Sequence, residues 1–152
     1  MFTDQKIKEL FDVMCLVYQS RKSTRDVDAI FKPAALLRKL AVELAETYHL
    51  SPQWLNDAAK GYLQNTFKKE AVLNFSHLRI WAPEAPYMLA MKCISARWDT
   101  YDREDVIFLL RFLKLKSTKE VFKIIESYYP KKLIPPKTQF FIEEIFDKNL
   151  RK

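Results

Sequence analysis

Two carboxylates two residues apart, Asp26 and Asp28, lie in the segment 21–31, which reads RKSTRDVDAIF. Side chains alternate between the two faces of a β-strand, so a strand here would place both acids on one surface. At the roughly 6–7 Å that separates such side chains, two negative charges repel and need a counter-charge or a shifted pKa. A divalent metal ion meets that need. The spacing therefore predicts a metal-binding pair, and a solvated strand end is the alternative.

A lysine is expected at the edge of a buried helix face. The segment 87–99 has the spacing of a helix on which Met88 and Ser95 share an apolar face, with Lys92 at its border. From there Lys92 could reach a phosphate group, and Arg97 one turn further on could support it. The alternative is a lysine that extends outward along its own aliphatic stem.

A third candidate, Asp105, begins a line of apolar residues. On a helix it aligns with Phe108, Leu109 and Phe112, the pattern of a buried stripe. A carboxylate at that place suggests a functional acid. Alternatively, Asp102 and Asp105 cap the free backbone amides at the start of the helix and interact with its dipole.

The elements that must position these residues are mainly helices. The single glycine, Gly61, favours a helix-rich chain with few tight hairpins. Strands are predicted over 26–31 and, as one or two strands that pair with the acidic strand, over 71–82. Helices are predicted over about 3–20, 32–50, 51–62, 85–98 and 103–115, from a capping box at Ser117-Thr118-Lys119-Glu120, and after a linker at 129–136. This order predicts a mixed α+β fold.

Composition limits the class of protein. A chain of 152 residues, 49% of them apolar, can bury one core without disulfides. Cys15 and Cys93 match no metal or redox spacing, so we expect both to be reduced, as in a cytoplasmic protein. The sequence shows neither a signal peptide nor a run of about 20 apolar residues, so no membrane partner is expected. The formal charge of +7 favours polyanionic partners.

Four stretches, in this order, resemble the bacterial minimal nucleotidyltransferases related to the AbiEii and MenT toxins of toxin–antitoxin systems. The stretches are 21–31, Trp54-Leu55-Asn56, Tyr87 to Lys92 with Ala96-Arg97, and Asp102 to Val106 ahead of Leu109-Leu110. The resemblance covers about residues 13–112. It implies a nucleotidyltransferase-like fold, a small mixed sheet flanked by helices, over residues 1–115, with 116–152 as a helical extension that packs on the same domain.

The resemblance also implies roles for the candidate residues. Asp26 and Asp28 would hold Mg²⁺, with Mn²⁺ as the alternative, and the metal would bridge to a nucleoside triphosphate substrate. Lys92 would neutralise phosphate charge, and Asp105 would help to hold the site or activate the attacking hydroxyl. The implied nucleotide-binding residues are Ser23, Arg25 and Arg97. The acceptor would be RNA, tRNA in the first place, or a protein hydroxyl, and a cognate antitoxin would be a partner.

The sequence departs from this family ahead of the acidic pair. Family members carry a strand and a Gly-Gly or Gly-Ser turn there, because only glycine lets backbone amides approach the triphosphate closely. Here the matching place reads Leu10-Phe11-Asp12-Val13. Either the natural start lies upstream, or the chain is a degenerate relative that acts by binding; a generic helical binding module is the third alternative. A missing first strand would leave a sheet edge unpaired, which predicts a homodimer or a rearranged N-terminal helix that covers it.

Overall fold

The computed structural model describes residues 27–64, 67–76, 78–97 and 102–150. The chain divides into two compact units, Met1–Gly61 and Tyr62–Lys152. The division expected from the sequence lies between residues 115 and 116. The predicted helix over 3–20 lies outside the described residues. Within the described part, no helix is long and apolar enough to cross a membrane.

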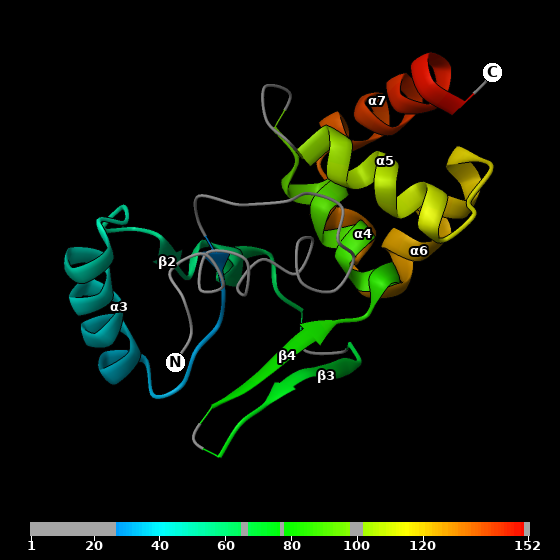
Figure 1. Ribbon diagram of the computed structural model, residues 1–152. Coiled ribbons are helices and arrows are strands. Elements are labelled where there is room, and N and C mark those ends of the chain that lie inside the picture. Colours follow the sequence, from blue (N-terminus) through cyan, green and yellow to red (C-terminus); the bar gives the residue numbers. More distant parts are fainter. Residues whose placement is uncertain (1–26, 65–66, 77, 98–101, 151–152) are drawn as a thin grey trace. The chain divides into compact units, whose positions relative to one another are not determined.

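The first unit is built around the parallel pairing of two short strands. Val27 is paired with Leu55, and Asp28 with Asn56. The core beside this pair consists of Val27, Ala41, Ala45 and Trp54. The elements are β1 (Val27–Asp28), α3 (Ala34–Tyr48), β2 (Leu55–Asn56) and a 3-10 helix, η1 (Ala58–Tyr62) (Figure 1). Helix α3 ends at Tyr48, close to the predicted end, and the backbone of the capping residue His49 is left-handed.

The predicted helix over 51–62 is wrong. A turn at Ser51, where the carbonyl accepts a hydrogen bond from the Trp54 amide at 2.9 Å, leads into β2 instead. The indole N–H of Trp54 donates to the Ala41 carbonyl of α3 at 2.9 Å. An extended backbone lets Trp54 bury its ring against α3 while the next two residues pair with β1, and this packing overrides the local helical signal.

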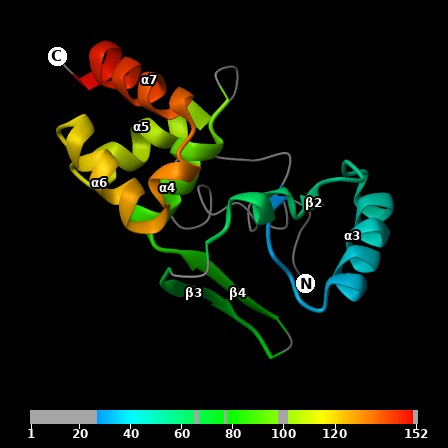
Figure 2. The same ribbon diagram turned by 180° about the vertical axis from the view of Figure 1, so that it is seen from behind.

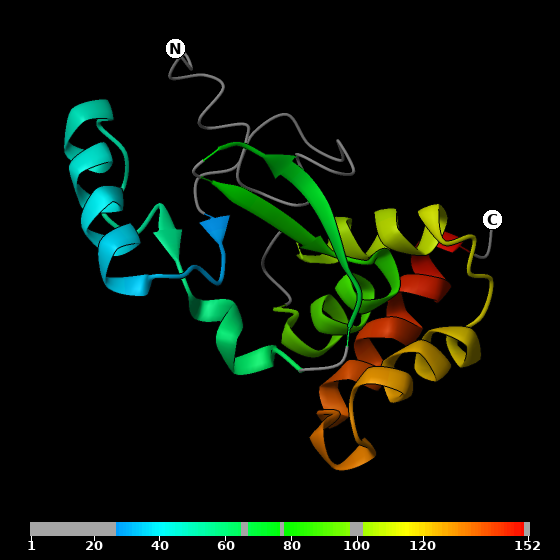
Figure 3. The same ribbon diagram turned by 90° about the horizontal axis from the view of Figure 1, so that it is seen from below.

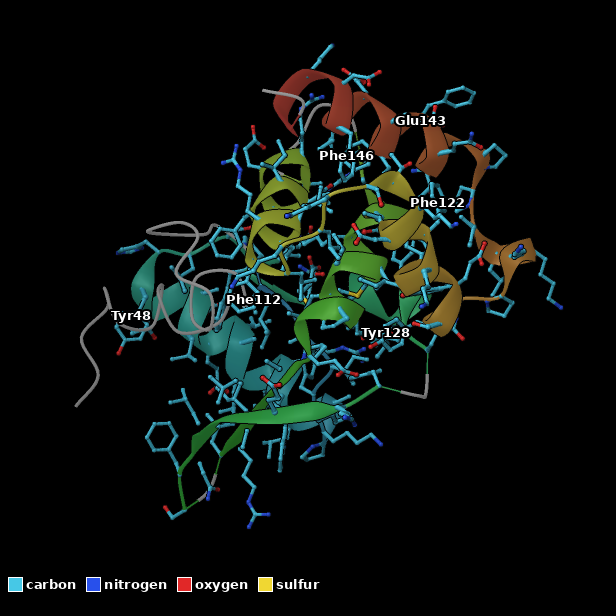
Figure 4. The ribbon with its side chains drawn as sticks, turned by 90° about the vertical axis from the view of Figure 1, so that its right-hand side faces the viewer. Tyr48, Phe112, Phe122, Tyr128, Glu143 and Phe146 are labelled. Carbon is cyan, nitrogen blue, oxygen red and sulfur yellow. The ribbon has the colours of Figure 1, made fainter. Side chains whose placement is uncertain are left out.

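The second unit combines a β-hairpin with a group of helices (Figures 1 and 2). Its elements are β3 (Lys69–Asn74), β4 (Arg79–Pro83), α4 (Ala85–Ser95), α5 (Asp102–Phe112), α6 (Thr118–Tyr128), η2 (Lys131–Leu133), α7 (Pro136–Ile145) and a final π-helical turn, η3 (Phe146–Leu150). Helix α4 packs against α5, α6 and α7. It is therefore buried on most sides, and Tyr87, Leu89 and Ala90 are fully enclosed. Figure 4 labels Phe122 and Tyr128 on α6 and Phe112 at the end of α5.

The α+β class is confirmed, but the predicted strand pairing is not. In the described residues β3 pairs with β4 antiparallel, whereas β1 pairs with β2. We had expected 71–82 to join the acidic strand in a single mixed sheet. The alternation of apolar and polar residues shows on which face of a strand each side chain lies. It does not show which strand pairs with which. Helix α5 also stops before the predicted residue 115, because Lys114 takes a left-handed conformation with a φ of 56°.

The predicted capping box is confirmed at the start of α6. The Ser117 hydroxyl oxygen accepts a hydrogen bond from the Glu120 amide at 3.3 Å, and the Glu120 carboxylate accepts one from the Ser117 amide at 3.0 Å. The same carboxylate also accepts a hydrogen bond from the Lys116 amide, which is the main cause of its lowered pKa. The cap is therefore weakened as the pH falls through the folded-state pKa of Glu120.

Replacing Ser117 by alanine should lower the free energy of unfolding by about 1 kcal/mol, since one helix-start amide loses its acceptor. Urea denaturation followed by circular dichroism measures this change. Ser127→Ala is the matched control, because its hydroxyl only donates to the Ile124 carbonyl within the last turns of the same helix. Equal stability of Ser117→Ala and Ser127→Ala would contradict the assignment.

Candidate active site

Helices α4 and α5 bring together Lys92 and two acids. The Lys92 ammonium lies 2.9 Å from Asp105 Oδ2 and 3.3 Å from Asp102 Oδ1. Lysine stands in the last turn of α4 and both acids in the first turn of α5. The helix dipole favours a positive charge at the C-terminal end of a helix and a negative charge at its N-terminal end. Two of the predicted site residues, Lys92 and Asp105, are therefore direct partners.

Burial makes this cluster energetically important. The side chain of Asp105 is 3% exposed, against 19% for Lys92 and 17% for Asp102. An isolated carboxylate at that depth would be costly, so the ammonium of Lys92 is needed to compensate it. With two acids and one lysine the cluster carries a formal charge of −1. The alternative in which Lys92 extends outward is therefore wrong.

The end of α4 is fixed by further hydrogen bonds. The Arg97 amide donates to Asp102 Oδ2 at 3.2 Å, which ties the residues after α4 to the start of α5. Lys137 donates to the Ala96 carbonyl at 2.9 Å, and the Thr138 hydroxyl donates to the Cys93 carbonyl at 3.4 Å, both from α7. These bonds tie the last turn of α4, which carries Lys92, to α5 and α7. Arg97 itself is exposed, as a nucleotide-binding residue would be.

Asp28 belongs to the first unit. Hydrogen bonds from the Val27 amide to the Trp54 carbonyl (2.6 Å) and from the Ala29 amide to the Asn56 carbonyl (2.8 Å) hold the strand. Val27 is 4% exposed, and alternation therefore places Asp28 on the exposed face. The predicted partners Ser23, Arg25 and Asp26 lie outside the described residues. Of the predicted acidic pair, the described residues contain only Asp28.

The register partner of Asp28, Asn56 on β2, also carries a side-chain oxygen, which accepts a hydrogen bond from the Ala58 amide at 3.0 Å. Parallel partners project to the same face of a sheet. Carboxylate and amide oxygens are ligands that Mg²⁺ accepts. Among the described residues, no group of three or more His, Cys, Asp or Glu side chains is gathered as for a metal ion.

Sequence reasoning missed two neighbours of the candidate residues. Asp102 was interpreted as a helix cap, but it contacts Lys92. The signal was present, because residues three apart on a helix lie on one face, as Asp102 and Asp105 do. Asn56 had no signal of its own, since its position beside Asp28 depends on the parallel pairing of β1 with β2.

A groove of about 480 Å³ lies between α6 and α7, and its lining includes Phe122, Ile134 and Glu143, two of which are labelled in Figure 4. Its described lining includes none of Asp28, Lys92, Arg97 and Asp105. In comparisons with family models, curated proteins and solved structures, nothing matches this chain.

Proposed function

We propose that the chain is a nucleotidyltransferase-like enzyme that transfers a nucleoside monophosphate from a nucleoside triphosphate to RNA, tRNA in the first place, or to a protein hydroxyl. The observation that carries the proposal is the ion pair of Lys92 with Asp105, 2.9 Å long and built from residues 13 positions apart. It supports the part of the proposed site that belongs to the second unit, where Lys92 and Asp105 match residue types of the resembling nucleotidyltransferases. A toxin of a toxin–antitoxin system, silenced by a cognate antitoxin, is the biological setting that this resemblance suggests.

In the proposed reaction a hydroxyl oxygen of the acceptor attacks the α-phosphorus. A new oxygen–phosphorus bond forms, the bond between the α-phosphorus and the bridging oxygen breaks, and pyrophosphate leaves. A bound Mg²⁺ or Mn²⁺ would supply charge stabilisation for the attacking and leaving oxygens. Asp26 and Asp28 would hold that ion, while Ser23, Arg25 and Arg97 would contact the nucleotide.

The contact between Lys92 and Asp105 refines their proposed roles. Asp105 is nearly enclosed and lies against the ammonium, so we assign it the positioning of Lys92. Lys92 would then contribute its charge to the phosphates from a fixed place. The acceptor proton would leave to a carboxylate of the site or to water.

The test is label transfer. The full chain is incubated with each of the four α-³²P-labelled nucleoside triphosphates, Mg²⁺ and either total RNA or total protein. We expect label in the acceptor fraction that disappears with EDTA and with the double variant Asp26→Ala, Asp28→Ala. No transfer from any nucleotide to either acceptor would reject the enzyme for this chain.

A second function, binding without catalysis, has one observation in its favour. Lys92 already has two carboxylate partners, so its charge is compensated within the protein. Thermal melting with Mg²⁺ and nucleotide separates the two functions, because a ligand that prefers the native state must stabilise it. A raised melting temperature without label transfer would favour a degenerate relative that acts as a binding partner.

A further inference from the structure

The β-hairpin of the second unit has two chemically different faces. The register pairs Ala71 with Trp81 and Asn74 with Arg79, and it pairs Leu73 with Ile80. Alternation therefore places Arg79 and Trp81 on one face of β4 and Ile80 and Ala82 on the other. Ala82 is 1% exposed and Trp81 is 52% exposed. We call the face that carries the exposed indole the Trp81 face. It consists of Lys69, Ala71, Asn74, Arg79, Trp81 and Pro83.

The Trp81 face carries positive charge and no carboxylate. Arg79 is exposed and forms no ion pair with any described residue, and Lys69 is exposed with its ammonium 5.7 Å from the centre of the Phe67 ring. The acid of the hairpin, Glu70, is paired in register with Ala82 and so belongs to the opposite face. Two cations thus flank one exposed indole with no negative charge on the same surface.

The position of the hairpin leaves this face accessible. From the helices of the second unit the two strands lead outward to a turn, which is closed by a hydrogen bond from the Phe75 amide to the Leu78 carbonyl at 2.8 Å (Figures 1 and 3). Phe75 and Leu78 near that turn are 40% and 39% exposed. A two-stranded ribbon is marginally stable on its own in water, and an exposed tryptophan on it leaves a large apolar surface without cover.

We infer that the Trp81 face binds single-stranded RNA, with the indole of Trp81 stacked on a base and with Arg79 and Lys69 against phosphates. An unpaired base offers an apolar ring face to the indole. The phosphates of the RNA backbone offer negative charge to Arg79 and Lys69, which have no carboxylate on this face. Aromatic rings beside cations are the elements by which proteins bind single strands without reading sequence. The inference rests on the proposed function in one respect, since it names where an RNA acceptor docks.

Charge and geometry favour RNA over a peptide strand. A peptide that extended the ribbon would bond to the backbone edge of a strand and would use Trp81 little. A base-paired duplex presents no open ring faces except at its ends. The indole and the guanidinium, on one face two residues apart, match a base and its neighbouring phosphate.

The experiment measures fluorescence anisotropy of a 5′-labelled, single-stranded RNA of about 12 nucleotides, within the usual site sizes for such proteins. The full chain is titrated at several salt concentrations. We expect Trp81→Ala to raise Kd about tenfold, because stacking on one base is lost, and Trp81→Phe to restore most of the affinity. Arg79→Gln should lower the slope of log affinity against log salt by about 0.7, the loss of one phosphate contact to a single strand.

Phe140→Ala and Arg111→Gln are the matched controls. Phe140 is 64% exposed on α7, and Arg111 is exposed at the end of α5 without an ion pair among the described residues. Both should bind RNA as the unchanged chain does. The inference is overturned if the unchanged chain does not bind, if Trp81→Ala binds as tightly as Phe140→Ala, or if a duplex of the same sequence binds better than the single strand. If Trp81→Ala fails to fold, an unchanged salt slope in Arg79→Gln overturns it instead.

This outcome is separate from that of the proposed function. RNA binding that depends on Trp81 stands even if no label is ever transferred, and label transfer to a protein acceptor stands even if RNA binding is absent. The two measurements therefore fail independently.

Discussion

Replacing Lys92 by methionine is expected to lower the free energy of unfolding by about 3 kcal/mol, because it removes one partner of a buried ion pair. The carboxylate left behind is that of Asp105, which is 3% exposed and 2.9 Å from the ammonium in the unchanged chain. Methionine keeps most of the length of the lysine side chain, so the change in packing is small. Guanidinium denaturation followed by circular dichroism gives the difference directly.

Two further variants separate the ion pair from other causes. Lys123→Met makes the same substitution at an exposed position of α6 and should change stability by less than about 0.5 kcal/mol. The double variant Lys92→Met, Asp105→Leu removes the lysine and the more deeply buried of its two acids and should recover most of the loss, as buried pairs replaced by apolar residues do. Asp102, which remains, is 17% exposed and still accepts a hydrogen bond from the Arg97 amide. A Lys92→Met chain as stable as Lys123→Met would show that Asp105 does not depend on the lysine.

Local patterns predicted most of the second unit. The hairpin strands followed from alternating side chains at 71–82, and α4 followed from the break at Pro83-Glu84-Ala85-Pro86. The start of α6 was set by Ser117 and Glu120, whose hydrogen bonds are made within one turn. In each case the residues that determine the element are neighbours in the chain, so sequence spacing contains the information.

Features that depend on distant residues were not predictable in this way. Trp54 leads into a strand rather than a helix because its indole N–H finds a partner on α3, 13 residues earlier. The contact of Asp102 with Lys92 depends on how α5 packs against α4. Periodicity placed Lys92 at the edge of the apolar face of its helix. It could not show which residues of another helix lie opposite that edge. In the structure Asp102 and Asp105 lie there. Lys92, expected as a phosphate ligand, therefore already pairs with two carboxylates of the protein.

Asp28→Asn is expected to reduce label transfer by at least about a hundredfold while leaving stability unchanged. A metal-held carboxylate contributes several kcal/mol of charge stabilisation in the transition state, and each 1.36 kcal/mol is a factor of ten in rate. Asparagine has the same shape, and the side chain of Asp28 lies on the exposed face of β1. The measurements are the rate of label transfer at saturating Mg²⁺ and the free energy of unfolding of the same preparation.

The effect of Asp28→Asn on label transfer is easier to interpret than that of Lys92→Met. A loss of activity in Lys92→Met has two causes, the missing charge and the weakened fold, which stability data must separate. Asp28→Asn keeps the shape of the side chain, and Val27 keeps the strand in the core whichever side chain follows it. Glu46→Gln, which neutralises another exposed acid of the first unit, should retain full transfer. Transfer that persists in Asp28→Asn would remove this carboxylate from the proposed metal site, because an amide cannot replace its negative charge beside a triphosphate.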